Sequence, residues 1–198
     1  MNDTALVRDA LKALEEGTVI SAKTVKALGS QEALSQILSH LARTGEVMRI
    51  ARGLYVVPVH GKFGTYPPSP DKVVRSYAKS NSQTVVPNGP VAANRLGLST
   101  QQPIRHVYLT SGRTTIFKLG SASVELRHAP EWQLLFPDCV AGEVIRALVF
   151  VGKANANESA LKLRRRLDPK EWEKLKRVKS KFPMWLREAI LAADELLT

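Results

Sequence analysis

Residues 48–58, MRIARGLYVVP, hold two short β-prone runs separated by Ala51-Arg52-Gly53. A glycine-containing turn between two such runs is typical of a β-hairpin. We therefore predict a hairpin with strands Glu46–Ile50 and Leu54–Val57. Arg49 and Arg52 bring two cations to this hairpin, and the residues before it indicate what those cations contact.

The residues that precede the hairpin have the patterns of three helices. Between Thr4 and Glu16, apolar residues recur with the spacing of an amphipathic helix, at Val7, Ala10, Leu11 and Leu14. Ser21 is a suitable N-cap for a short helix over 22–28, and Ser30 is one for a longer helix that ends near Arg43. A short helix, a tight glycine turn and a longer helix form a helix-turn-helix.

A hairpin directly after the third helix is the wing of a winged helix-turn-helix. In that arrangement the third helix enters the major groove, and the wing lies along the flanking phosphates or the minor groove. We expect Gln31, Ser35 and Gln36 to contact bases, because glutamine and serine can hydrogen-bond base edges. Gly53 is expected to permit close approach of the wing backbone. The predicted DNA-binding residues are Lys23, Lys26, Ser30, Gln31, Ser35, Gln36, Ser39, His40, Arg43, Arg49 and Arg52.

Two other readings of this region stay open. Polar residues on a helix surface are often simply solvated, and a wing is as good a surface for a protein partner as for DNA. Residues 1–64 carry eight basic and six acidic residues, so the charge of this region is only modestly positive.

The chain as a whole is strongly basic. Its 198 residues include 29 Lys and Arg against 18 Asp and Glu, which gives a net charge of +11. Such a field attracts polyanions, so nucleic acid is the expected partner, although an acidic protein also fits. No apolar run reaches the roughly 18 residues of a membrane span, and the N-terminus lacks the features of a signal peptide. We expect a cytoplasmic protein that contacts no membrane.

The remainder of the chain predicts a second domain. Residues 60–70 are dense in Gly and Pro, which indicates a linker between a domain over 1–59 and a domain over 71–198. The fold class is therefore α+β, with an N-terminal winged helix-turn-helix followed by a mixed C-terminal domain. We expect helices over 71–79, 91–96 and 141–151, helices that begin at Asp168 and Pro183, a strand over 84–86, and a small antiparallel sheet over 106–109, 114–117 and 123–127.

Basic residues cluster again near the C-terminus. Six of them are candidates for additional contacts with phosphate or with a partner: Lys162, Arg164, Arg165, Arg166, Lys174 and Arg177. Interspersed glutamates equally fit a solvated helix face.

The sequence contains no catalytic signature that we can identify. Cys139 is the single cysteine, and the four histidines show no metal-ligand spacing. No phosphate-binding loop, dinucleotide-binding glycine pattern or nucleophile elbow is present. Glu125 and Arg127 alternate on a predicted strand, where a surface ion pair is the simpler interpretation. We expect no enzymatic activity, no cofactor and no metal.

Two segments resemble a known family. GEVMRIARGLYVVP (45–58), and VVPNGPVAANRLGLSTQQP (85–103) followed by VYLTSG (107–112), are similar to the AbiEi-type antitoxins of abortive-infection toxin–antitoxin systems. The resemblance covers most of the chain and is strongest up to about residue 130.

The resemblance implies a bacterial antitoxin that takes part in phage defence. Its winged helix would act with a basic C-terminal domain, bind repeats in double-stranded DNA of its own promoter and repress transcription. The C-terminal domain would counteract a toxin encoded next to it, commonly a nucleotidyltransferase-like protein. Arg49, Arg52 and the third helix would carry DNA binding, whereas Gly53 and Tyr55 would be structural. Toxin-contacting residues do not carry over, because family members differ in whether antitoxin and toxin touch.

Two other functions remain under consideration. The protein could neutralise its toxin by direct contact, with DNA binding secondary, or it could be a stand-alone winged-helix transcription factor. The oligomeric state also stays open: a dimer on an inverted repeat and a monomer on each repeat both fit.

Overall fold

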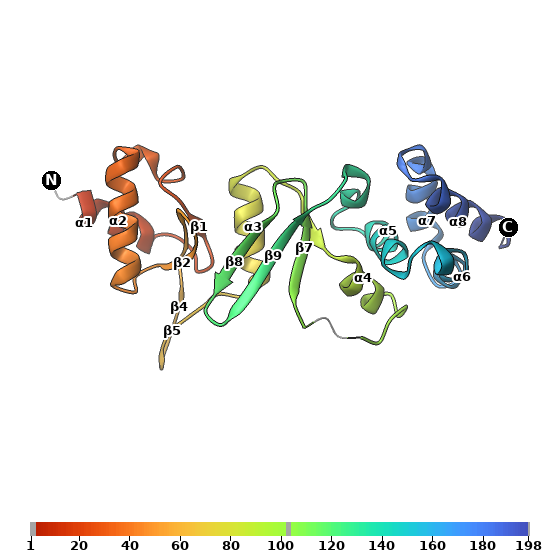
Figure 1. The fold of residues 1–198 in the computed structure, drawn as a ribbon, viewed down its shortest axis with the longest axis horizontal. Coiled ribbons are helices and arrows are strands. Elements are labelled where there is room, and N and C mark those ends of the chain that lie inside the picture. The colour runs from red at the N-terminus through yellow and green to blue at the C-terminus, as the bar shows by residue number, and fades with distance from the viewer. Residues whose placement is uncertain (1–2, 102–103, 198) are drawn as a thin grey trace. The chain divides into compact units, whose positions relative to one another are not determined.

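Helices and short strands both build the protein in a computed structural model that describes residues 3–101 and 104–197 (Figure 1). The described part contains eight α-helices and three small sheets, so the protein is mixed α+β, as the sequence predicts. Residues 102–103, which end the second segment of the family resemblance, lie outside the described residues.

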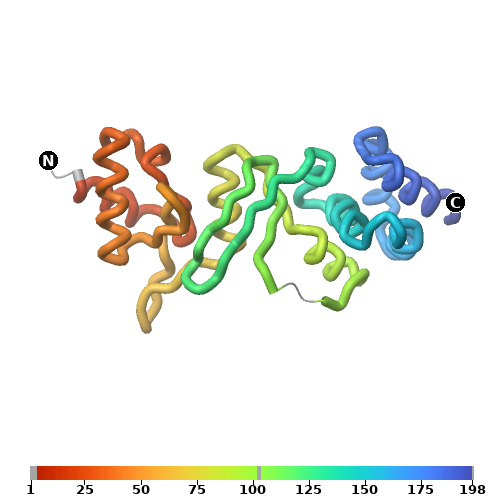
Figure 2. The backbone as a smooth tube through the Cα atoms, in the orientation of Figure 1, coloured from red at the N-terminus to blue at the C-terminus, as the bar shows by residue number. Residues whose placement is uncertain are grey.

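The chain forms two compact units. Unit 1 runs from the N-terminus to Gln83 and also includes Thr114–Glu125, whereas unit 2 consists of Thr84–Arg113 and of Leu126 to the C-terminus. This division does not coincide with the predicted domains, since the sequence places the boundary at 60–70. The difference arises because the segment Thr114–Glu125, which is distant in sequence from the N-terminal region, belongs to unit 1 (Figure 2).

Unit 1 begins with two of the three predicted helices and with the predicted hairpin. Its elements are α1 (Asp3–Lys12), β1 (Val19–Ile20), the 3₁₀ helix η1 (Lys26–Leu28), α2 (Gln31–Arg43), β2 (Met48–Ala51), β3 (Leu54–Val56), β4 (Val59–Gly61), β5 (Gly64–Tyr66), α3 (Pro70–Ser80) and β8 (Thr115–Leu119). The three antiparallel strands β1, β3 and β2 form a sheet in that order, with β3 at its centre.

The central strand β3 is buried on both faces of this sheet. Tyr55 packs into an apolar cluster with residues of α1 and α2, such as Val7 and Leu38. Val56 is buried on the opposite face, because neighbouring residues of a strand point to opposite sides. On that side α3 contacts β1 and β8 lies beside β2. The sheet is therefore enclosed from two directions.

Contacts between α3 and the strands tie the later segments to the first sixty residues. The Ser76 hydroxyl of α3 accepts a 2.7 Å hydrogen bond from the Val19 amide. Tyr77 of α3 meets Phe117 of β8 edge to face, with 4.9 Å between ring centroids. Phe117 is fully buried.

Two predictions for the N-terminal region are wrong. The helix predicted over 22–28 is a set of turns followed by η1, because Ser21 and Thr24 exchange hydrogen bonds that close a tight turn. The first helix ends at Lys12 instead of Glu16, which leaves Leu14 37% exposed. The predicted linker is also structured in part, since β4 and β5 form a hairpin within it.

Unit 2 is mostly helical. Its elements are β6 (Val85–Pro87), α4 (Gly89–Arg95), β7 (His106–Thr110), the 3₁₀ helix η2 (Glu131–Leu134), α5 (Val140–Val151), α6 (Lys153–Arg164), α7 (Pro169–Arg177), the 3₁₀ helix η3 (Lys179–Lys181) and α8 (Met184–Glu195). β9 (Ala122–His128) begins in unit 1 and ends in unit 2, and it belongs to a four-stranded sheet with the order β6-β7-β9-β8.

The buried helix α5 is the centre of unit 2. It contacts α4, α6 and α7, and its apolar residues join Trp172 and Leu186 in one large core. The predicted strands and the helix over 141–151 are confirmed. Helix α6 is an addition that the sequence did not suggest. The last helix, α8, ends at Glu195, and Leu197 beyond it is 41% exposed.

Two carboxylates lie at the start of α7. The Asp168 carboxylate caps the helix by accepting a 2.7 Å hydrogen bond from the Lys170 amide. Glu171 acts at a different helix end. Its carboxylate accepts a hydrogen bond from the Ala141 amide at the start of α5, so it joins two helices.

We expect Phe117→Ala to destabilise unit 1 by about 3–5 kcal/mol, because it removes a large, fully buried side chain. Urea denaturation measures the loss, and faster hydrogen exchange at the Val56 amide locates it in the N-terminal sheet. Ile116→Ala is the matched control, because Ile116 is 57% exposed on the same strand. Equal stability of the two variants would show that β8 is not part of unit 1.

Candidate nucleic-acid interface

Helix α2 presents a polar face to solvent. Ser30 caps its start by accepting a hydrogen bond from the Ala33 amide, and Leu34, Leu38 and Leu41 are buried on the inner side. The outer side holds a surface depression of about 480 Å³ that is lined by Gln31, Glu32, Ser35 and Gln36. The three residues predicted to contact bases therefore lie together at one end of the helix.

The polar side chains of this face differ in their internal hydrogen bonds. Ser35 donates to the Gln31 carbonyl at 2.7 Å, and the Ser39 hydroxyl lies 2.9 Å from the hydroxyl of Tyr55. Within the described residues, the side chains of Gln31 and Gln36 make no hydrogen bond. The two glutamines thus have unused donors and acceptors, whereas Ser39 holds α2 against β3.

The hydrogen bond between Ser39 and Tyr55 indicates where Arg49 lies. Arg49 is the cross-strand partner of Tyr55, and directly opposed residues of antiparallel strands point to the same face of a sheet. Arg49 therefore lies on the face that packs against α2. It is exposed, and its Nε donates only a long 3.4 Å hydrogen bond to the Ala51 carbonyl.

The turn between β2 and β3 carries the second cation. Arg52 is exposed and has no ion pair within the described residues. Gly53 follows it with a φ of +69°, a conformation that favours glycine. A Cβ at Gly53 would meet no atom within 4 Å, so the turn needs glycine for its backbone conformation and not for close contact inside the chain.

Further exposed cations surround α2. Lys23 and Lys26 lie in the turns before it, and His40 and Arg43 lie in its last turn. Glu32 is an exposed acid on the same helix. The predicted DNA-binding residues thus share the region of α2, η1 and the β2–β3 hairpin, and all of them are solvent-exposed.

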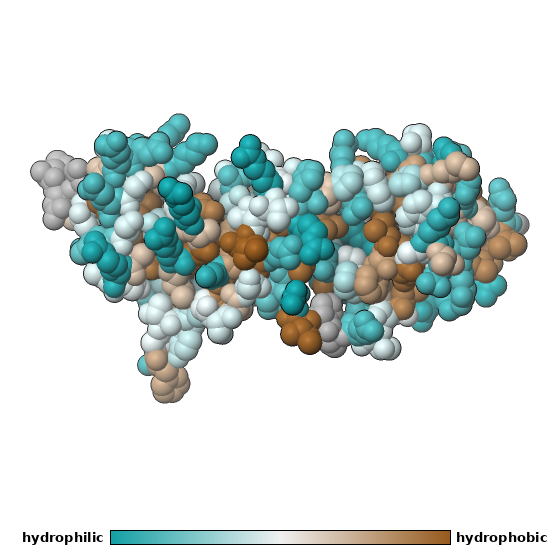
Figure 3. Space-filling model, in the orientation of Figure 1, coloured by the Kyte–Doolittle hydropathy of each residue, from teal (hydrophilic) through white to brown (hydrophobic). Residues whose placement is uncertain are grey.

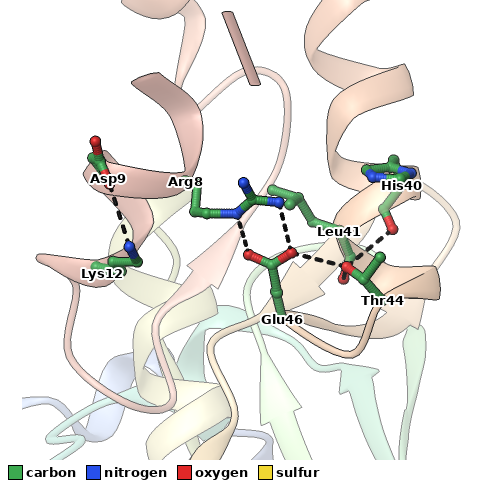
Figure 4. A network of polar contacts seen from close by, with 7 residues as sticks. All are labelled: Arg8, Asp9, Lys12, His40, Leu41, Thr44 and Glu46. Atoms are coloured by element: carbon green, nitrogen blue, oxygen red, sulfur yellow. Dashed lines mark hydrogen bonds and ion pairs between the residues drawn. The ribbon is translucent and has the colours of Figure 1, made fainter. Parts of the chain in front are cut away.

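A polar network fixes the turn from α2 to β2 (Figure 4). The Arg8 guanidinium of α1 pairs with both carboxylate oxygens of Glu46, with Nη2 2.9 Å from Oε1. The Thr44 hydroxyl lies 3.0 Å from the same Oε1 and 3.1 Å from the Leu41 carbonyl oxygen. The hydrogen bond from Arg8 lowers the pKa of Glu46 below its ordinary value, with Thr44 adding to the effect. This network sets the point at which the hairpin leaves the helices.

The β4–β5 hairpin is a feature that the sequence interpretation missed. It extends away from the helices of unit 1, and its end appears as an apolar tip in Figure 3. Phe63 in its turn is 93% exposed and follows Lys62. The His60 amide donates a 3.0 Å hydrogen bond to Glu16, which anchors the hairpin base. The available signal was the pair Gly61 and Gly64, which flanks a two-residue turn at Lys62 and Phe63.

The C-terminal cations fall into two groups. Lys162 pairs with Glu158, Arg164 with Asp194, and Lys174 with Glu171. Lys176, which also binds Asp194 at 2.6 Å, lowers the pKa of this carboxyl together with Arg164. In contrast, Arg165, Arg166 and Arg177 are exposed and have no ion pair among the described residues. The charges of this second group are therefore not compensated by an ion pair and are available to an outside anion.

Metal binding finds no support among the described residues. They contain no group of three or more His, Cys, Asp or Glu side chains that could hold a metal ion. None of the described helices is long and apolar enough to span a membrane.

The features above describe a basic, mixed α+β protein with a polar helix face and two exposed hairpins. Comparison with known families then places the chain: residues 6–175 match the family described as "Family of unknown function (DUF6088)", and the protein belongs to that family. No curated protein and no solved structure matches the chain.

Replacing Glu46 tests the network at the hairpin base. A lowered pKa means that ionised Glu46 stabilises the fold above its unfolded pKa, near 4.5, and that this contribution is lost as the pH falls through the folded value. Glu46→Gln should therefore lower the thermal unfolding midpoint at pH 7, and the difference from the wild type should shrink at pH 3. Asp9→Asn is the control, because Asp9 is 75% exposed in a 3.4 Å pair with Lys12. An equal loss at both pH values would contradict the assignment.

Proposed function

We propose that the protein binds double-stranded DNA through unit 1. The order of elements, α1, β1, η1, α2, β2 and β3, with the sheet order β1-β3-β2, fits a winged helix-turn-helix in which η1 and its turns replace the second helix. α2 is then the recognition helix, and β2–β3 is the wing.

One observation carries the proposal. The hydrogen bond between Ser39 and Tyr55 joins the recognition helix to the wing strand, and the register of β2 and β3 brings Arg49 to the same face. In this proposal the exposed glutamines of α2 and the cations of the wing belong to one DNA-binding surface. Glutamine can read adenine in the major groove, while arginine neutralises flanking phosphates.

The β4–β5 hairpin offers a further contact in this proposal. Proteins that bind the minor groove often insert an apolar side chain at a base step beside a basic residue. Lys62 and Phe63 provide this combination at the end of a hairpin without acidic residues.

We also propose that the DNA is the protein's own promoter and that the protein acts as an antitoxin. This part of the proposal depends on the resemblance of residues 45–58 and 85–112 to AbiEi-type antitoxins. In this scheme unit 1 represses transcription, and unit 2, with 17 basic and 10 acidic residues, counteracts a toxin, directly or indirectly. A toxin-like reading frame adjacent to the gene supports the scheme, and its absence favours a stand-alone transcription factor.

Charge reversal at the wing tests DNA binding. Arg49→Glu with Arg52→Glu should abolish a specific gel shift with the protein's upstream region, and single neutral substitutions should each reduce the slope of log affinity against log salt by about 0.9. Arg75→Glu with Lys79→Glu is the matched control, because both residues are exposed on α3 of the same unit. Equal loss in both double variants would mean that only net charge matters and would contradict an interface at the wing.

Base recognition has a separate test. Gln31→Ala and Gln36→Ala should each weaken binding to the specific site by about 1–3 kcal/mol and leave binding to unrelated DNA unchanged. Titrations of both DNAs at one salt concentration measure the ratio of the affinity for the specific site to the affinity for unrelated DNA. Parallel losses on both DNAs would show that α2 does not read bases.

Toxin rescue distinguishes the two roles assigned to the units. Growth of cells that express the adjacent toxin should be restored by the wing variant as well as by the wild type. Loss of rescue with promoter binding intact would favour direct neutralisation of the toxin by the surface of unit 1.

A further inference from the structure

Helix α5 carries an arginine inside the core of unit 2. Arg146 is 1% exposed and stands in the otherwise apolar run VIRALVF. Its Nη1 donates a 3.3 Å hydrogen bond to the Gln133 carbonyl, whereas its Nε and Nη2 are buried and have no hydrogen-bond partner. Burying a guanidinium with two unpaired nitrogens costs free energy unless another group accepts their hydrogen bonds.

The carboxylate of Glu143 does not pair with this guanidinium. Glu143 lies one helical turn before Arg146, but its Oε1 accepts a 2.8 Å hydrogen bond from Arg95. Burial lowers the pKa of Arg146 to about 10, with Glu143 opposing this shift and Arg95 adding to it. Arg146 is therefore still charged at neutral pH, and its charge is only partly compensated.

Arg146 lines a cavity of about 440 Å³ that is formed wholly by residues of unit 2. Arg127 and His128 at the end of β9 also line it, and no acidic residue is among its lining residues in the described part of the chain. The His128 Nδ1 lies 2.8 Å from the Gly112 carbonyl oxygen, which orients the ring. The remaining walls are mostly apolar, including Val107, Leu109, Val149 and Phe150.

The PNGP turn at residues 87–90 closes one side of this cavity. Asn88, Gly89 and Pro90 line it, and a Cβ at Gly89 would come within 2.7 Å of the Phe150 Cβ and 2.8 Å of the Arg146 carbonyl oxygen. Glycine is needed here because the turn lies directly against the backbone of α5. This contact gives a structural role to a motif that the nucleic-acid interface does not use.

The unpaired atoms of Arg146 define what would bind. Nε and Nη2 form one edge of the guanidinium, and their two parallel N–H groups match two oxygens of a phosphate or carboxylate. Two arginines at one cavity favour a dianion over a monoanion. The apolar walls suit an organic group attached to it, and the volume lies within the usual range for small-molecule sites.

We propose that this cavity binds a small phosphate monoester, with the phosphate on the Nε–Nη2 edge of Arg146 and the organic group against the apolar walls. Arg127 brings a second positive charge to the same cavity. The proposal does not depend on DNA binding by unit 1.

Isothermal titration of the full-length protein with phenyl phosphate tests the site. Arg146→Met should weaken binding by at least about tenfold, since it removes a buried charged partner. Arg177→Met is the matched control, because it removes an exposed arginine of the same unit without touching the cavity. Val107→Trp is a second variant that fills the cavity and keeps every cation, and it should also abolish binding.

Stability in the absence of ligand separates this role from a structural one. Because Arg146 is buried and underbonded, Arg146→Met should unfold at the same temperature as the wild type or higher. Phenyl phosphate should raise the unfolding temperature of the wild type and of Arg177→Met but not that of Arg146→Met. A lower unfolding temperature of Arg146→Met without ligand, together with unchanged phosphate binding, would overturn the proposal.

Three further arms identify the ligand class. Benzoate should bind more weakly than phenyl phosphate, and phenol should not bind, if the dianion is recognised. Benzoate binding as tight as phenyl phosphate would overturn the phosphate assignment. A different outcome is that phenyl phosphate does not bind the wild type and that Arg146→Met loses DNA binding. Arg146 would then contact the nucleic-acid backbone, and the proposal of a phosphate monoester site would be overturned.

Discussion

Burial of the central strand β3 on both faces is the constraint on which the rest of unit 1 depends. Tyr55 must pack towards α1 and α2, and Val56 must pack towards α3 and β8. A three-residue strand cannot meet both requirements with local contacts alone. The position of the β2–β3 hairpin, the register that orients Arg49, and the inclusion of residues 114–125 in the unit are all consistent with this constraint.

Positive charge has two different uses in this protein. Arg8, Arg164 and Lys176 are paired with carboxylates that join elements distant in sequence, so they stabilise the fold. Lys23 and Lys26 before α2, and Arg49 and Arg52 of the β2–β3 hairpin, are exposed and have no such pairs among the described residues. Their charges are therefore available to an outside anion. Arg146 belongs to neither group, because it is buried and still has unpaired donors.

The sequence predicts elements that local chemistry controls and misses those that depend on distant contacts. The apolar stripe and serine cap define α2, and the apolar run defines α5, so both were predictable. The segment 22–28 has helical spacing but is too short to resist the turn between Ser21 and Thr24. Contact of Phe117 with Tyr77 across 40 positions has no local signature, so the extent of unit 1 was not predictable. The predicted interface residues share one region, whereas Arg146 and Phe63 were missed, because a single arginine or phenylalanine has no periodicity.

The discontinuity of unit 1 has a consequence for biosynthesis. A ribosome releases the first 83 residues well before β8, and in that interval one face of the β1-β3-β2 sheet lacks part of its apolar cover. Thirty residues of unit 2 must leave the exit tunnel before the missing strand arrives. The nascent chain therefore passes through a stage at which chaperones can bind the exposed sheet. Unit 1 can complete its folding only after residues 114–125 have been translated.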